Sequence, residues 1–108
     1  MANTFKNSFS KDVGTSAATI YTAPSATQTT LIGLSVANTT ASPITCDAYV
    51  TSSAVDYYLI KGAPVPVGGS LVIVGGDQKV VLEAADALKV ISSAASSADV
   101  VCSLLEIA

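Results

Sequence analysis

The chain has 108 residues, five lysines, no arginine, no histidine and a net charge of -3 at pH 7. Histidine is the commonest general base and metal ligand, and binding to a nucleic-acid backbone needs a basic patch, so these classes of function are disfavoured. No stretch approaches the ~20 apolar residues of a membrane helix. We therefore expect no enzyme, cofactor, small-molecule substrate, nucleic acid or membrane partner.

Half of the residues are hydrophobic and only 12% are charged. This balance excludes a generally disordered chain and fits one small domain with its own core. So little charge also suggests that part of the surface contacts a partner. The polar N-terminal sequence has no apolar stretch of a secretory signal, which indicates a protein made in a reducing cytoplasm.

The N-terminal segment, residues 1–15, shows no clear periodicity. Phe5 and Phe9 are the only phenylalanines, and their spacing is that of one face of a helical turn. The pattern predicts an N-terminal arm in front of a domain formed by residues 16–108. Two interpretations stay open: the rings dock on their own domain, or the arm reaches into a neighbouring subunit.

From residue 16 onward the chain contains about eight short β segments separated by turn residues. In one of them Ile44, Cys46 and Ala48 alternate with Asp47 and Tyr49, as in a strand with one buried and one wet face. Regular short strands predict an antiparallel β-sandwich or jelly roll. The sixth and seventh segments are expected to pair as a hairpin. The segments are 18–24, 31–40, 44–52, 56–61, 70–74, 79–83, 87–93 and 98–108.

The stretch "VGGSLVIVGGDQKVVL" places two Gly-Gly pairs around a short apolar run. A phosphate-binding loop needs G-x-x-x-x-G-K-[ST] between a strand and a helix. Here Lys79 is followed by Val80 and the glycine spacing does not match. The pattern therefore predicts turns on both sides of a strand at 70–74. The turn glycines are Gly68, Gly69, Gly75 and Gly76.

No group of side chains forms a recognisable catalytic or metal site. Asp77, Glu83 and Asp86 lack the dense oxygen ligands of a calcium loop and are interpreted as turn residues. The abundant serines have no histidine as a base, and no lysine lies in an S-x-x-K motif. We therefore assign no catalytic, cofactor-binding or metal-binding residue.

The two cysteines, Cys46 and Cys102, both fall on the apolar parity of their segments. One interpretation is a pair of buried thiols that act as small hydrophobic side chains. The other is a disulfide across the core of the sandwich, which is less common in a protein made in the cytosol. The spacing alone leaves both open.

Tyrosines gather near the middle of the chain, and Tyr49 and Tyr58 are candidate interface residues. Because Tyr57 and Tyr58 are adjacent, one is expected to face the core and the other the solvent. An exposed tyrosine can anchor a protein interface or stack on a sugar ring.

Four stretches together resemble small virion structural proteins of tailed bacteriophages, especially cyanophages. They are "MANTFKNSFSKDVGT", "TTLIGLSVANTT", "DYYLIKGAPVPVGGSLVIVGGDQKVVLEAADALKV" and "SSADVVCSLLEI", which cover nearly the whole chain. The matching motifs are turns and strands rather than catalytic residues. The resemblance implies a β-sandwich that assembles on the virion as a symmetric homo-oligomer, with a trimer as the first expectation.

Among virion roles, the resemblance favours a capsid decoration (cement) protein that bridges major capsid protein subunits on the capsid exterior after assembly in the host cytoplasm. The expected interface residues are Phe5, Phe9, Tyr49 and Tyr58. An accessory protein of the tail, neck or fibre is the main alternative. A host-glycan-binding adhesion module is the other.

Overall fold

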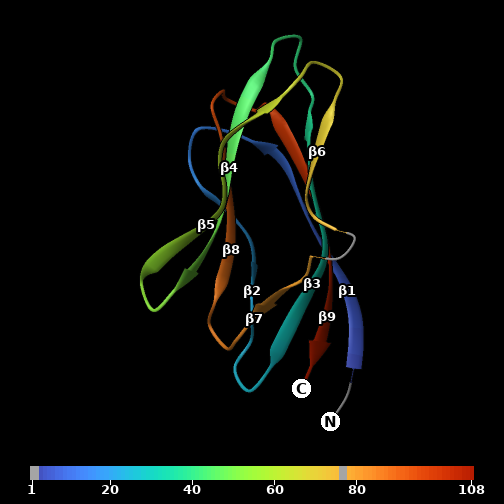
Figure 1. Ribbon diagram of the computed structural model, residues 1–108, viewed down its shortest axis with the longest axis vertical. Coiled ribbons are helices and arrows are strands. Elements are labelled where there is room, and N and C mark those ends of the chain that lie inside the picture. Colours follow the sequence, from blue (N-terminus) through green and yellow to red (C-terminus); the bar gives the residue numbers. More distant parts are fainter. Residues whose placement is uncertain (1–2, 76–77) are drawn as a thin grey trace.

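The computed structural model describes residues 3–75 and 78–108, and within them the chain forms nine β-strands and no helix (Figure 1). The predicted all-β class is confirmed. Eight of the strands correspond to the segments expected from the sequence, and the ninth is the N-terminal segment. The strands are β1 (Asn3–Val13), β2 (Ala18–Thr22), β3 (Gln28–Asn38), β4 (Ile44–Ser52), β5 (Val55–Val65), β6 (Ser70–Val74), β7 (Val80–Leu82), β8 (Ala87–Ser92) and β9 (Ala98–Ile107).

The strands form two antiparallel sheets that face each other as a β-sandwich. The first, sheet A, has the order β1-β9-β3-β6, and β7 pairs with the other half of β3. The second, sheet B, has the order β2-β8-β4-β5. In Figure 1 most of sheet A lies at the right and most of sheet B at the left.

The core lies between the sheets and is made by alternate residues of each strand. On β9, Val100, Cys102 and Leu104 are buried while Val101 is exposed, as the period-two pattern predicted. Burial of each large aliphatic side chain contributes about 1.5–3 kcal/mol. The largest fully buried aliphatic side chains are Leu31, Leu34, Leu82, Leu88, Leu104, Val36, Val65, Val74, Val90 and Val100.

One strand departs from simple alternation. In β3 the pairing with β9 shifts register between Leu31 and Gly33. A β-bulge of this kind inserts one extra residue into the strand. The residues before the bulge therefore point to the opposite face from the one that simple alternation would give them. Leu31 is therefore fully buried and Ile32 only half-buried, whereas alternation alone predicted Ile32 in the row of Leu34.

The N-terminal segment is not a separate arm in this structure. It forms strand β1 at the edge of sheet A and pairs with β9 from Asn3 opposite Ile107 to Val13 opposite Ala98. The spacing of Phe5 and Phe9 is therefore that of a strand and not of a helical turn. Phe5 and Phe9 share a face because positions four apart in a strand have the same parity, and the rings do not dock on their own domain.

The first Gly-Gly pair forms the predicted turn. The Gly69 amide donates a hydrogen bond to the Pro66 carbonyl oxygen, with N···O 3.0 Å, and Gly68 has φ +69°. A Cβ atom at Gly69 would lie 2.9 Å from Cγ of Pro66. Only glycine fits there without a shift of the proline ring, so this pair is explained by the turn alone.

The second pair does not reverse the chain. After β6 ends, Gln78 donates a backbone hydrogen bond to the Gly75 carbonyl oxygen (3.2 Å), and the chain rejoins β3 as β7. Because β6 and β7 are both antiparallel to β3, they act as one interrupted edge strand. The hydrogen bond from Gln78 to Gly75 spans a turn as predicted, although the strands on either side do not form a hairpin. Gly76 lies outside the described residues.

The expected hairpin of the sixth and seventh segments is also wrong. The turn itself exists: the Asp86 amide bonds to the Glu83 carbonyl oxygen, and a carboxylate oxygen of Asp86 accepts from the Glu83 amide, both at 3.0 Å. However, β7 belongs to sheet A and β8 to sheet B, so this turn carries the chain from one sheet to the other. Asp77 lies outside the described residues.

Both cysteines are buried free thiols, Cys46 in sheet B and Cys102 in sheet A. Of the two interpretations of the sequence, the structure therefore agrees with a pair of buried thiols and not with a disulfide. Burial raises the pKa of both thiols, that of Cys102 to about 11. At neutral pH neither is a reactive thiolate.

We expect the folded protein to resist alkylation at pH 8, because both thiols are buried and protonated. After denaturation without a reductant, both thiols should become accessible and react rapidly. Intact-mass spectrometry measures this directly as no label in the native protein and two labels in the denatured protein. A denatured protein that takes no label would instead contain the disulfide.

Candidate interaction surfaces

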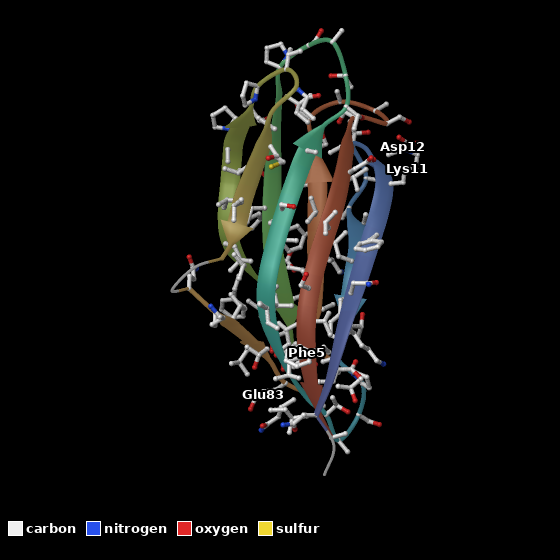
Figure 2. The ribbon with its side chains drawn as sticks, turned by 90° about the vertical axis from the view of Figure 1, so that its right-hand side faces the viewer. Phe5, Lys11, Asp12 and Glu83 are labelled. Carbon is white, nitrogen blue, oxygen red and sulfur yellow. The ribbon has the colours of Figure 1, made fainter. Side chains whose placement is uncertain are left out.

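The outward side of sheet A carries large exposed apolar side chains. Five of them are between 47% and 77% exposed, and Phe5 (77%) and Phe9 (65%) are the most prominent because of their size. We call this surface the apolar face. Figure 2 looks onto it, with β6, β3, β9 and β1 side by side. Its strongly exposed residues are Phe5, Phe9, Val72, Val81 and Val101.

The strand register organises these side chains into two rows across the sheet. In one row Phe9 lies opposite Val101, which lies opposite Ser35, which lies opposite Val72. Neighbouring positions in such a row have Cβ atoms about 5 Å apart and form a continuous surface.

The second row is built in the same way. Phe5 lies opposite Leu105, then Thr30 and Val81 follow across the sheet. Each row therefore begins with a phenylalanine on β1 and ends with an exposed valine, which places aromatic groups along one side of the apolar face.

No position of the two rows carries a charged side chain. Charged residues lie near the ends of the face, where Figure 2 labels Lys11 and Asp12 at the top and Glu83 at the bottom. Lys11 forms an ion pair with Asp99, with N···O 3.7 Å. The face is thus an uncharged surface with a polar margin, the usual composition of an interface core and its rim.

A polar network holds β1 in place beneath this face. Lys6 pairs with Glu106 (3.0 Å), and the Tyr21 hydroxyl donates to the same carboxylate (2.5 Å) and lies 2.9 Å from the Thr29 hydroxyl. The hydrogen bond from Tyr21, and then that from Lys6, lowers the pKa of Glu106. Burial and the bond to Glu106 raise the pKa of Tyr21 to about 12. The network joins β1, β9 and β3 of sheet A to β2 of sheet B.

Replacing Tyr21 by phenylalanine should lower the free energy of unfolding by about 1–2 kcal/mol, because the buried Thr29 and the Glu106 carboxylate each lose a partner. Urea unfolding measures the change. Tyr57→Phe, on an exposed tyrosine, is the matched control and should be near neutral. An equal loss in both variants would contradict this role for the network.

The same network predicts how stability depends on pH. A lowered carboxyl pKa gives stability that is present above about 4.5 and is lost as the pH falls through the folded pKa. A raised tyrosine pKa gives stability that is present below 10 and is lost as the pH rises toward about 12. Tyr21→Phe should remove the part of the alkaline loss that Tyr21 causes, while the two buried thiols, whose pKa values are also raised, still contribute theirs. It should weaken the acid loss, since Lys6 still pairs with Glu106. Unfolding curves across this pH range test both limbs.

A second exposed surface lies on the far side of the molecule, at the β4–β5 hairpin. Ser53 and Ala54 form its two-residue turn with φ +51° and +63°, the backbone conformation of a type I′ hairpin. The hairpin projects beyond the sandwich at the left of Figure 1, away from sheet A. Val55, Tyr57 and Tyr58 are exposed there, and we call these three residues the hairpin tip.

The tyrosines differ from the sequence prediction. Tyr49 is only 8% exposed, so the prediction that it lies on the wet face of its strand is wrong, and little of its ring is accessible for the interface role predicted from the sequence. Its ring centroid lies 4.9 Å from that of Tyr58, and the Lys61 ammonium lies 4.6 Å from the Tyr58 centroid on the ring face. Tyr49 therefore packs beside Tyr58 as its partner on the neighbouring strand. Tyr57 and Tyr58 are both exposed because the hairpin extends past the sandwich, where no second sheet covers it.

Sequence reasoning found Phe5, Phe9 and Tyr58 but missed the other members of both surfaces. The alternation of "ADVVCSLLEI" does place Val101 opposite the core, and that signal could have been used. Val72 lies in a wholly apolar run, and alternation gives no signal there. Its exposure follows only from the register with β3.

Besides these two surfaces, the described residues form an open hollow at one end of the sandwich. It has a volume of about 490 Å³, is lined by 26–28, 83–84 and 107–108, and has Glu83 as its only titratable side chain. Across residues 3–75 and 78–108 no three potential metal ligands come together, and no helix is long and apolar enough to cross a membrane. The described surface instead carries two groups of exposed apolar side chains, the apolar face and the hairpin tip.

Comparison with known proteins adds no assignment, because this chain matches no protein-family model, no curated protein and no solved structure.

Proposed function

We propose that this chain is a non-enzymatic structural protein of a tailed-phage virion, a decoration protein that bridges major capsid protein subunits on the outside of the head. The observation that supports this most is the pair of exposed apolar surfaces on opposite sides of one small sandwich (Figures 1 and 2). A protein that ties neighbours together needs two such surfaces. The sequence resemblance supplies the virion context.

The surfaces suit binding through shape and burial. The apolar face carries two phenylalanines and the hairpin tip two tyrosines, and aromatic side chains give much contact area for little loss of conformational freedom. The sheet beneath the apolar face is fixed by a continuous core, and the hairpin tip is held by the pairing of β4 with β5 and by the contact between Tyr49 and Tyr58. Little of the binding energy is then spent on ordering the protein.

The mechanism is energetic and involves no chemistry. A molecule that binds the assembled capsid and not its separated subunits stabilises the assembly by mass action. Bridging adjacent subunits adds contacts that must break before the shell can open. An accessory protein of the tail or neck would use the same two surfaces, and its copy number in the virion would differ.

Binding to capsids that lack this protein tests the proposal. Purified protein should co-sediment with such heads up to a fixed ratio and should raise the temperature at which they release DNA. The paired substitutions Val55→Thr and Tyr57→Thr change one surface, and Phe5→Thr and Phe9→Thr change the other. Each pair should weaken the bridge. Protein that neither binds heads nor alters their opening would overturn the capsid role.

A further inference from the structure

The apolar face lies on one of the long sides of the molecule (Figure 2). In the view of Figure 2 the molecule extends 45 by 22 Å, an outline of about 1000 Å². Each partner in a standard interface buries about 800 Å². The two rows run across four strands of this outline. The outline is the upper limit for the face, and this limit exceeds the area that one partner buries in a standard interface.

Charge identifies the partner class. A partner with its own charged patch would leave those charges buried and unpaired against the two uncharged rows, at high cost. The same face of another copy presents no charge at these positions and meets no like-charge repulsion. The chain's net charge of -3 is carried elsewhere, so it remains outside the contact.

The free edge of β1 is protected, which favours contact through the face. Lys6 and Lys11 lie on this strand and both are ion-paired within the chain. The pairing with β9 shifts register between Ser10 and Val13, where Asp12 has φ +56°. Charged residues and irregularities of this kind are the usual protection against edge-to-edge pairing.

We propose that the apolar face packs against the same face of another copy of this chain. Two copies can meet across a two-fold axis, or three can turn their faces toward a three-fold axis, and both arrangements bury Phe5 and Phe9. The self-association is inferred from the surface of the chain itself, and only its location in the virion rests on the proposed function. It leaves the hairpin tip free to contact the capsid.

The mass of the purified protein in solution tests the inference. Light scattering or sedimentation across a concentration series should give two or three times the 10.8 kDa of one chain. Phe5→Thr with Phe9→Thr should reduce the mass to that of the single chain, since threonine keeps the strand propensity and removes the rings. Phe5→Leu with Phe9→Leu should retain the association.

The matched control is Val55→Thr with Tyr57→Thr, which should leave the mass unchanged. Circular dichroism and thermal unfolding establish that each variant is folded. A wild-type protein that is monomeric at every concentration would overturn the inference, as would a threonine variant that associates like the wild type. A monomer that still decorates capsids would remove self-association and leave the proposed function standing.

Discussion

Removing the first 13 residues should destabilise the sandwich by at least about 3 kcal/mol, a large share of the ~5–15 kcal/mol typical of a domain. The deletion removes strand β1, including the buried Val13, and exposes the β9 edge. Loss of Val13 alone removes about 1.5–3 kcal/mol of burial, and the pairing with β9 and the Lys6–Glu106 ion pair are lost as well. Urea unfolding of the truncated protein measures the change.

Its matched control is the surface variant Phe5→Thr with Phe9→Thr. Both side chains are exposed in the single chain, so this variant should keep most of its stability. It should lose only the contacts that the two rings make with a binding partner. If the truncated protein unfolded at the wild-type urea concentration, β1 would be a dispensable tail. The arm interpretation would then be restored.

The second large effect is expected at Leu104, which is 1% exposed in the core. Leu104→Ala should lower the free energy of unfolding by about 2–5 kcal/mol, since it removes buried methyl groups and leaves a cavity. Leu105 is the matched control, because it is the next residue on the same strand and points to the opposite face. In the single chain Leu105→Ala should cost far less.

The two leucine substitutions also distinguish an effect on the core from an effect on the interface. Leu105 lies in the row of Phe5, so Leu105→Ala should weaken self-association while Leu104→Ala acts on folding. Unfolding experiments at low protein concentration and mass measurements at high concentration separate the two effects. Equal losses of stability at both positions would contradict the alternation of β9.

The strands that period-two patterning could predict are those with one buried face. Strand β9 alternates from Ala98 to Leu104 because the facing sheet covers one of its sides. Strand β4 alternates only from Ile44 to Ala48, and the next residue, Tyr49, is buried as well. Strand β1 escaped prediction because its pattern is inverted: Phe5 and Phe9 point outward, while Lys6 and Ser8 point inward to polar partners. A sequence rule that places apolar residues inside has no means to detect such a strand.

Other features depended on tertiary structure. The turn after β7 was predictable from its residues, but its crossing between sheets was not. The same turn residues occur whether the two flanking strands pair with each other or belong to different sheets. Burial of Tyr49 follows from the register that brings Tyr58 beside it. The apolar face combines residues from five strands, and only the order of sheet A brings them together.

The most direct test of the decoration role is the copy number of this protein relative to the major capsid protein in purified virions, by quantitative mass spectrometry. A decoration protein should give a ratio near one or a simple fraction such as about one third, as expected for symmetric sites over the whole head. A few to a few dozen copies per particle would contradict this role and would place the protein in the neck, tail or fibres.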